Sequence, residues 1–254
     1  MIPLGIIPAR YGSSRFPGKP LADILGKPMI WHVYERSRQA LEHVVVATDD
    51  RRIFETCLDH NINVVMTGSH HRSGTERCRE AAEKYIDQTS INFDLVINIQ
   101  GDEPLIDPQI IKALTDAFRQ DTQIATLIKP EKLTERLFNP NTVKVVIDQS
   151  GYAVYFSRQA IPFLRDIPKN EWTRNHDFFT HIGIYAYRTD VLNKIVNLPE
   201  SPLEKAEKLE QLRWLDHGYK IKTVKTNYSG IGVDTQKDLE EVIKFLKHKG
   251  YEQF

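Results

Sequence analysis

The chain has 254 residues, and its 34 basic and 34 acidic side chains give a formal net charge of zero. Hydrophobic residues make up 41% of the sequence and aromatic residues 9%, as in ordinary globular proteins. This length suits one large α/β domain, or such a core with a small appended subdomain. The balanced charge argues against nucleic acid as the main partner, because duplex binding depends on neutralising phosphates.

The cysteine content and the hydropathy pattern indicate where the protein acts. Cys57 and Cys78 are isolated and form no metal-ligand spacing, which is typical of buried thiols in a reducing compartment. The N-terminal apolar run breaks at Pro8 and Arg10 and lacks a basic leader, so it does not resemble a signal peptide. No apolar stretch approaches the roughly 20 residues of a membrane span. We therefore expect a cytoplasmic protein with no membrane contact.

The first predicted strand, residues 4–8, opens into a loop that carries the cations Arg10, Arg15 and Lys19. Glycines within this loop let backbone N–H groups approach phosphate oxygens, and the cations would neutralise their charge. The segment predicts a nucleoside triphosphate site. The alternative is a surface loop that happens to be cationic.

The loop is not a Walker A motif. Five residues separate Gly12 from Gly18, whereas a Walker A loop has four between its glycines. Pro20 follows Lys19, so no hydroxyl stands where that motif holds magnesium. A P-loop kinase or ATPase is thereby excluded.

The rest of the first half alternates helices and strands. Hydrophobic periodicity predicts helices over 29–40, 51–60, 75–85 and 108–118, and strands over 44–47, 63–66, 94–99 and 124–128. Pro28 is expected in a helical first turn, and Asp107 as an N-cap before Pro108. The rhythm predicts an α/β fold with a doubly wound, mostly parallel, Rossmann-like sheet. Ligands bind beyond the carboxyl ends of such strands.

The rhythm changes from about residue 138. We expect strands over 143–147, 153–156, 181–187 and 220–225, a hairpin turn at 148–151, one helix from Ser201 through Gln211, and a closing helix over 235–247. The polar stretch 166–177 is given no structure or role. These features predict a single domain, 1–254, with an inserted mixed α/β subdomain over about 138–215.

Two carboxylates are candidate magnesium ligands. Asp102 follows the predicted strand 94–99, and Mg²⁺ usually takes one or two carboxylates together with phosphate and water. Its alternative is an ordinary Gly-Asp-Glu-Pro turn. Asp234 precedes Thr235 and Asp238, which have the spacing of a capping box and leave Asp234 available.

Other candidate segments are weaker when taken singly. Residues 73–77 form a loop-to-helix junction that would bind a base or phosphate, or simply be a solvated helix start. His70 and His71 read as loop residues. His181, Tyr185 and Tyr187 fall on one face of a strand, which is more often core than site. No order of residues indicates a covalent nucleophile.

Taken together, the motifs resemble one family, the cytidylyltransferases that make CMP-activated 3-deoxy-manno-octulosonate (Kdo). The segments that carry the resemblance span about residues 6–240, in the family's order: 7–11, 14–15, 17–21, 73–77, 100–104, 138–141, 143–146, 155–158, 181–185, 201–204, 209–213 and 232–235. The resemblance implies a nucleotidyltransferase fold, CTP and a 3-deoxy sugar acid as substrates, Mg²⁺, and a homodimer formed largely by the later subdomain.

The resemblance also assigns site residues. It implies that the nucleotide is bound by Ala9, Arg10, Lys19, Ser73, Gly74, Arg77 and Gln100. It implies that the sugar is bound by Arg15, Gln100, Arg158, His181, Tyr187, Glu210 and Gln211. Asp102 and Asp234 would hold magnesium and, with Lys19, carry catalysis. Only the sugar pocket separates Kdo from 8-amino-Kdo or a sialic acid as acceptor, and a non-catalytic nucleotide-binding regulator is the alternative from another class.

Overall fold

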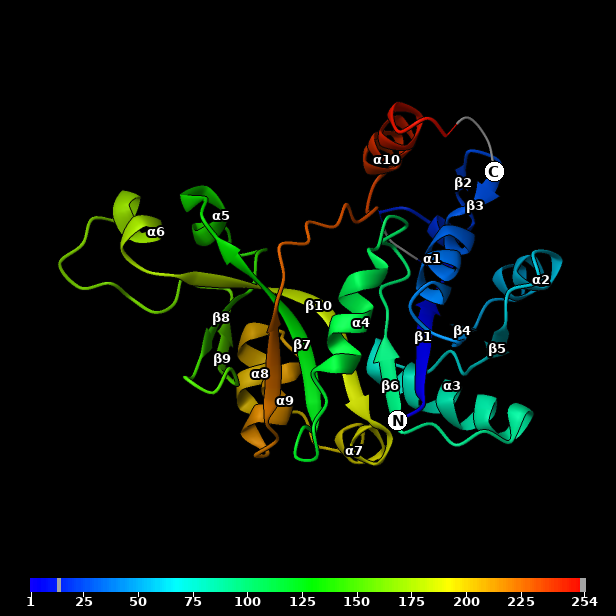
Figure 1. Ribbon diagram of the computed structural model, residues 1–254, viewed down its shortest axis with the longest axis horizontal. Coiled ribbons are helices and arrows are strands. Elements are labelled where there is room, and N and C mark those ends of the chain that lie inside the picture. Colours follow the sequence, from blue (N-terminus) through cyan, green and yellow to red (C-terminus); the bar gives the residue numbers. More distant parts are fainter. Residues whose placement is uncertain (13–14, 252–254) are drawn as a thin grey trace. The chain divides into compact units, whose positions relative to one another are not determined.

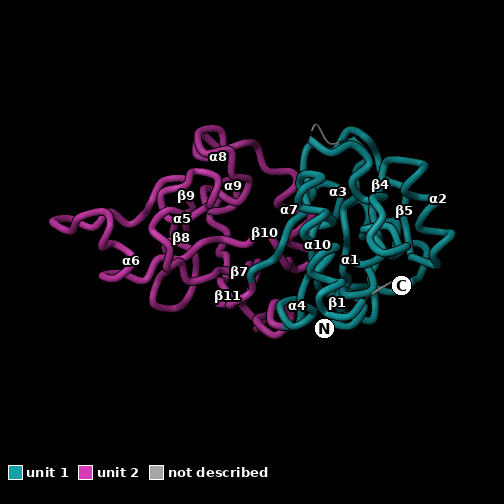
Figure 2. Tube along the Cα trace, turned by 90° about the horizontal axis from the view of Figure 1, so that it is seen from above, with its two compact units in different colours: residues 1–112, 229–254 teal, residues 113–228 magenta. Residues whose placement is uncertain are grey.

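The computed structural model describes residues 1–12 and 15–251 (Figure 1). It divides into two compact units: residues 1–112 with 229–254, and residues 113–228 (Figure 2). The predicted insert, about 138–215, lies within the second unit, which begins before it at residue 113 and ends after it at residue 228. That this segment serves sugar binding and dimerisation stays a prediction.

The first unit is built on parallel strands in the order β6–β1–β4–β5. The strands are β1 (Pro3–Ala9), β4 (His43–Thr48), β5 (Val64–Met66) and β6 (Leu95–Asn98). Their interiors are apolar and fully buried, as parallel strands covered on both faces must be. The expected doubly wound, mostly parallel architecture is confirmed.

Helices follow these strands as the sequence pattern predicts. They are α1 (Met29–Arg38), α2 (Arg51–Asp59), α3 (Gly74–Thr89) and α4 (Pro108–Asp116), with a closing α10 (Gln236–His248). A short 3-10 helix, η1 (Lys19–Leu21), and a two-stranded ribbon, β2 (Asp23–Ile24) with β3 (Lys27–Pro28), lie between β1 and α1. Pro28 is the N-cap of α1 rather than a first-turn residue. Asp107 caps α4 as predicted, accepting a hydrogen bond from the Gln109 N–H.

The second unit is mixed. Strand β7 (Ile124–Glu131) runs parallel to β11 (Ile221–Lys225) and antiparallel to β10 (Phe178–Arg188). The predicted hairpin is present as β8 (Lys144–Ile147) and β9 (Ala153–Ser157), with β8 also paired to β10. The helices are α5 (Thr134–Phe138), α6 (Trp172–Asn175), α7 (Thr189–Ile195), α8 (Pro202–Glu207) and α9 (Gln211–Asp216).

One expectation for the second unit is corrected, and one stretch that was left unassigned contains regular structure. The helix expected from Ser201 through Gln211 is two helices, because Lys208 adopts a left-handed conformation (φ 54°) that ends α8. The polar stretch 166–177 contains a 3-10 turn, η2 (Lys169–Glu171), and α6. Trp172 in α6 is buried against Phe178 and Leu137, so this stretch shares a small core with α5 and the start of β10.

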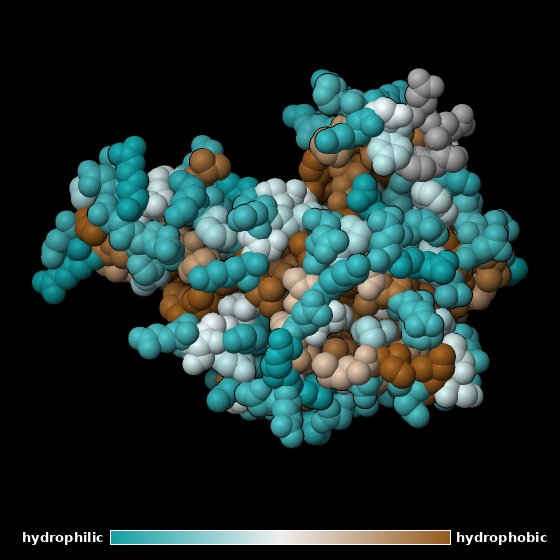
Figure 3. Space-filling model, viewed as in Figure 1, coloured by the Kyte–Doolittle hydropathy of each residue, from teal (hydrophilic) through white to brown (hydrophobic). Residues whose placement is uncertain are grey.

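Hydrophilic residues cover most of the face of the molecule drawn in Figure 3. Among the described residues, no helix is both long enough and apolar enough to cross a membrane.

Candidate active site

The phosphate loop is closed at its base by Tyr11 and Gly18. The Gly18 N–H donates to the Tyr11 carbonyl oxygen at 2.9 Å, and Gly18 has a φ of +72°, which favours glycine. A Cβ at Gly18 would lie 3.1 Å from the Tyr11 ring, which also contacts the Arg52 guanidinium, 3.2 Å from the ring centroid. Residues 13 and 14 of this loop lie outside the described residues. The ends of the loop are therefore held together, directly before Lys19.

Lys19 lies between the two predicted magnesium ligands. Its Nζ is 2.9 Å from Asp102 Oδ2 and 3.2 Å from Asp234 Oδ1. The Lys19 side chain is only 14% exposed, whereas Asp102 and Asp234 are 34% and 49% exposed. Each carboxylate thus keeps a surface open to solvent while it contacts the same ammonium group.

Backbone contacts bring these carboxylates together although they are far apart in sequence. The Val233 N–H donates to the Asp102 carbonyl oxygen at 2.8 Å, which joins the segment before α10 to the loop after β6. Gly101 lies so close to β1 that a Cβ there would meet the Pro8 carbonyl oxygen at 2.6 Å. Only glycine permits this close approach of the loop after β6 to the end of strand β1.

The predicted capping box at the start of α10 is confirmed. Thr235 accepts from the Asp238 N–H, and the Asp238 carboxylate accepts from the Thr235 N–H. The hydrogen bond from the Thr235 hydroxyl lowers the pKa of Asp238, with a further contribution from the Asp234 N–H. The cap uses the carboxylate of Asp238 and leaves that of Asp234 facing Lys19 and Arg15, whose Nη2 is 3.0 Å from Asp234 Oδ2.

The two carboxylates fit a magnesium ion. They converge on one ammonium group, so the site already attracts a cation. Within the described part of the chain, no group of three or more His, Cys, Asp or Glu side chains forms a metal site. Two carboxylates alone suit Mg²⁺, which leaves its other positions to phosphate oxygens and water.

One hollow in the first unit gathers the predicted residues of the phosphate loop. Its volume is about 410 Å³, and the predicted residues that line it are Ala9, Arg10, Arg15, Lys19, Gln100 and Asp102. Three of these carry positive charge. The hollow is therefore suited to a polyanion near a carboxylate pair.

Residues 73–77, which were predicted to bind the nucleotide, also have structural roles at the start of α3. Ser73 is the N-cap of α3, and its side chain accepts from the Glu76 N–H at 3.2 Å. Gly74 lies beside Asn98: a Cβ added at Gly74 would be 3.3 Å from Asn98 Nδ2. Both stand at a helix N-terminus, where backbone N–H groups favour anions.

Arg77, expected to contact cytidine, is fully buried instead. Its Nη1 donates to Thr67 Oγ1 at 2.5 Å and its Nη2 to Asp49 Oδ2 at 2.8 Å. In this arrangement the guanidinium presents no surface to a ligand, so Arg77 acts within the protein. Thr67 and Asp49 are its partners, and no sequence motif pointed to either.

Arg158 in the second unit is also engaged by the protein. Its Nε donates to the Glu207 carbonyl oxygen at 2.7 Å, and its Nη atoms lie near the carbonyl oxygens of Pro140 and Lys208. Buried Lys144 donates to the carbonyl oxygens of Arg158 and Thr142. Arg158 therefore ties the C-terminal end of α8 to β9, and its cationic edge is largely occupied.

His181 is embedded among aromatic rings. Its centroid is 5.2 Å from those of both Phe156 and Tyr185, and its Nε2 is 2.9 Å from Thr126 Oγ1. Burial lowers the pKa of His181 to about 3. The imidazole is thus neutral at physiological pH and can offer a ligand a hydrogen bond but no charge.

Tyr185 is not among the predicted site residues, but its ring contacts those of His181 and Tyr187. A bulge in β10 shifts the register with β7 between Ile182 and Tyr185, so simple alternation does not describe this strand. Tyr185 lies against His181, and burial, together with the charge of Glu210, raises its pKa well above the ordinary value. Tyr187 is fully buried and stacks on Tyr185. The resemblance implied His181 and Tyr187 as sugar-binding residues, and the period of two places Tyr185 on the same face of the strand.

Glu210 and Gln211 lie where the chain turns into α9. Glu210 is the N-cap residue and Gln211 the first residue of the helix, 5% exposed. The charge of Glu210 acts on Tyr185, so it belongs to the same neighbourhood as the aromatic cluster. Of the predicted sugar-binding residues of the second unit, Tyr187 and Gln211 are buried, whereas Arg158, His181 and Glu210 are partly buried.

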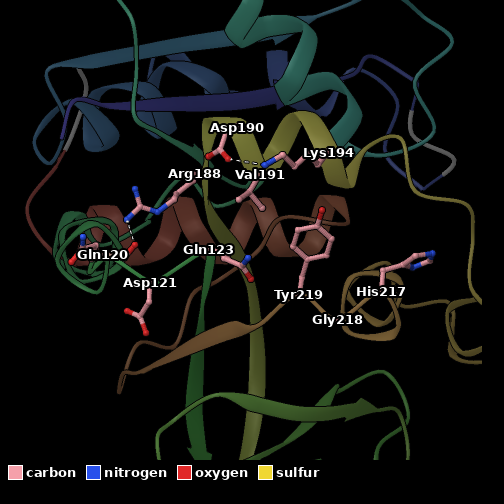
Figure 4. Close-up of a pocket in the computed structure, with 10 residues that line it drawn as sticks. All are labelled: Gln120, Asp121, Gln123, Arg188, Asp190, Val191, Lys194, His217, Gly218 and Tyr219. Atoms are coloured by element: carbon pink, nitrogen blue, oxygen red, sulfur yellow. Dashed lines mark hydrogen bonds and ion pairs between the residues drawn. The ribbon is translucent and has the colours of Figure 1, made fainter.

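A separate pocket of about 540 Å³ in the second unit contains none of the predicted residues (Figure 4). Arg188 donates to the carbonyl oxygens of Thr122, Arg119 and Gln120, while Lys194 pairs with Asp190 at 3.0 Å. Since these cations already have protein partners, the pocket is a weaker candidate for an anionic substrate than the hollow beside Lys19.

Comparison with known proteins agrees with this geometry. A family model described as cytidylyltransferase matches residues 4–221. The 3-deoxy-manno-octulosonate cytidylyltransferase of Parabacteroides distasonis is 50% identical over 251 residues, covering 97% of this chain and 98% of its own. The enzyme of the same name from Porphyromonas gingivalis is 50% identical over 253 residues, covering 98% of both chains.

Solved structures give the same picture. A CMP:2-keto-3-deoxy-manno-octonic acid synthetase complexed with CTP superposes with a TM-score of 0.88 at 41% identity, covering 98% of this chain and 100% of its own. A cytidylyltransferase from Leptospira borgpetersenii, 19% identical with a TM-score of 0.64, shares the fold. The chain belongs to the cytidylyltransferase family. Within that family it groups with the 3-deoxy-manno-octulosonate cytidylyltransferases, the CMP-Kdo synthetases.

Proposed function

We propose that this chain transfers CMP from CTP to the anomeric hydroxyl of 3-deoxy-D-manno-octulosonate, yielding CMP-Kdo and pyrophosphate for lipopolysaccharide biosynthesis. The observation that carries the proposal is the contact of Lys19 with both Asp102 and Asp234 beside the phosphate loop. The similarity to named Kdo cytidylyltransferases along nearly the whole chain supports the choice of substrates.

The reaction needs charge neutralisation and alignment rather than a covalent intermediate. The sugar hydroxyl attacks the α-phosphate, and negative charge grows on the departing pyrophosphate. Arg10 and Lys19 supply positive charge in the hollow where the triphosphate would lie. A magnesium ion held by Asp102 and Asp234 would lower the pKa of the attacking hydroxyl and neutralise phosphate charge.

The sugar acid brings a second anion next to the triphosphate. Two anions that approach in a partly desolvated cleft repel strongly unless fixed cations lie nearby. Arg15 is a candidate for this position, because it comes from the phosphate loop and is 67% exposed. Arg158, His181, Tyr187, Glu210 and Gln211 are proposed to form the sugar-binding side, with neutral His181 acting as a hydrogen-bonding group.

Three further elements of the proposal rest on resemblance and composition. The active form is a homodimer that contacts its copy largely through the later subdomain. Two free buried cysteines suit a reducing cytoplasm. No nucleic acid or membrane is needed for the reaction.

The test is pyrophosphate release with CTP and a panel of acceptors: Kdo, 8-amino-Kdo, a sialic acid, and the matching neutral ketose. We expect release with CTP and Kdo, dependence on Mg²⁺, and none with the neutral ketose. Preferred use of 8-amino-Kdo would change the acceptor and keep the reaction class. CTP binding without release for any acid would indicate a non-catalytic nucleotide-binding regulator instead.

A further inference from the structure

The segment between β5 and α3, residues 67–73, contains a buried polar cluster that the proposed reaction does not use. Glu80 and Glu76 lie one turn apart on α3 and face this segment. Glu80 accepts hydrogen bonds from the Gly68 N–H at 3.0 and 3.2 Å, and Glu76 accepts one from the Arg72 N–H at 2.8 Å. The two carboxylates thus hold both ends of the loop 67–73 against helix α3 through hydrogen bonds.

His71 lies at the centre of this cluster. Its side chain is 5% exposed and its Nε2 hydrogen-bonds to Glu80 Oε2. Burial alone would raise the pKa of Glu80, but the hydrogen bonds from Lys84, the Gly68 N–H and His71 outweigh it and lower the pKa to about 2. Glu80 is therefore an ionised hydrogen-bond acceptor, and His71 is the donor through its Nε2–H group.

The backbone of His71 reaches the phosphate loop. Its carbonyl oxygen accepts a hydrogen bond from Arg10 Nη2 at 2.6 Å. Burial and the charge of Arg77 lower the pKa of Arg10, while Asp49 and Glu76 oppose this change. The hydrogen bond holds the Arg10 guanidinium against the loop that Glu80 contacts, and Arg10 also lines the hollow beside Lys19.

We propose that Glu80, acting through His71, is a positioning residue for Arg10, and that this contact orients the Arg10 guanidinium for the triphosphate. Glu80 touches no substrate; it fixes His71, whose carbonyl oxygen sets the direction of Arg10. The inference rests on the proposed function, because it presumes that Arg10 binds the triphosphate.

The experiment is a double-mutant cycle on CTP affinity, measured by titration calorimetry without the sugar. Glu80→Gln keeps the shape of the side chain and removes its charge. We expect about a tenfold weaker binding of CTP, which corresponds to the loss of one charge-assisted contact. In an Arg10→Ala background the same change is expected to weaken binding by less than about twofold, because coupled residues are not additive.

Glu83→Gln is the matched control. Glu83 lies on the same helix and pairs with Arg79 at 2.6 Å, with 49% of its side chain exposed. We expect the control to leave CTP affinity unchanged, and Glu80→Gln to leave the KM for the sugar unchanged. His71→Leu serves as a second variant if Glu80→Gln does not fold, with the same expected cycle.

The outcomes separate this inference from the proposed function. Equal losses from Glu80→Gln in both backgrounds, or no loss in the parent protein, would overturn the positioning role alone. An Arg10→Ala variant that binds CTP as tightly as the parent would overturn the role of Arg10 in the triphosphate site, and the positioning role with it. A parent protein that does not bind CTP would overturn the proposed function itself.

Discussion

The predicted residues of the two units differ in how much of their charge the protein already uses. In the first unit, Lys19 pairs with both Asp102 and Asp234, and the two carboxylates keep exposed surface. In the second unit, Arg158 is held by backbone carbonyl oxygens, and His181 is a neutral ring among aromatic side chains. The first group can exchange its internal partners for a charged ligand, whereas the second has a firm structural role as well.

This difference separates two kinds of substitution. Substitutions of Lys19, Asp102 or Asp234 remove a charge whose partners lie within the same site. They are therefore expected to lower activity and to leave the fold intact. Changes in the second group also remove contacts that hold strands and helices together. Activity and stability measured side by side therefore tell the two kinds apart.

The largest effect is expected for the carboxylate pair. Asp102→Asn or Asp234→Asn is expected to reduce turnover at least about a hundredfold, because a metal ion provides several kcal/mol of charge stabilisation. Removal of Mg²⁺ is expected to act similarly. Steady-state kinetics with CTP and Kdo measure the loss, and thermal unfolding serves as the control for an intact fold. Activity of Asp102→Asn within a few-fold of the parent would remove this residue from the mechanism.

The next effect is expected at Lys19. Lys19→Ala is expected to lower kcat about a hundredfold and to weaken CTP binding much less, because charge grows on the leaving pyrophosphate in the transition state. Separate determination of kcat and of the CTP dissociation constant tests this. A change confined to the KM for CTP would mean that Lys19 contributes ground-state binding only.

Arg15 and Arg158 sharpen the comparison directly. Arg15→Ala is expected to raise the KM for both substrates without changing the melting temperature, because its exposed ion pair with Asp234 contributes little stability. Arg158→Ala is expected to raise the KM mainly for the sugar and to cost about 1–3 kcal/mol of stability, since its carbonyl partners lose a donor.

Steady-state kinetics with both substrates varied test the expected KM changes for both arginine variants, and thermal unfolding tests the expected stability changes. An Arg15→Ala variant with changed constants for CTP alone would contradict a position between the two anions. An Arg158→Ala variant that melts like the parent would show that its carbonyl contacts do not hold β9 and α8 together.

The last effect is confined to acidic pH and concerns His181. Burial lowers its pKa from 6.5 to about 3, so between these values the unfolded chain binds a proton that the folded chain does not. The contribution of His181 to stability is therefore lost as pH falls from about 6.5 to about 3. His181→Gln removes this linkage, and its melting temperature is expected to fall less steeply over that range. Glu80 and the other carboxylates titrate in both proteins, so parallel curves would refute the buried neutral state.

Local pattern was enough to predict most of the fold. The alternation of apolar runs with helical periodicity placed the parallel strands and their helices, because burial on both faces demands continuous apolar residues. The helix caps at Asp107 and Thr235 could also be predicted from the sequence, because capping depends on residues within one helical turn. The break at Lys208 was not readable, because a left-handed lysine has no distinctive local signature.

The chemical character of the candidate site followed from residue type: cations in a glycine loop and carboxylates after strand ends suit phosphate and magnesium. Only the tertiary structure decided which of those charges meet. Lys19 contacts both Asp102 and Asp234 where a backbone hydrogen bond joins residues 102 and 233, and no local pattern encodes this long-range pairing. Burial likewise decided that Arg77 serves the protein interior and that His181 is neutral, because desolvation depends on neighbours brought in by the fold.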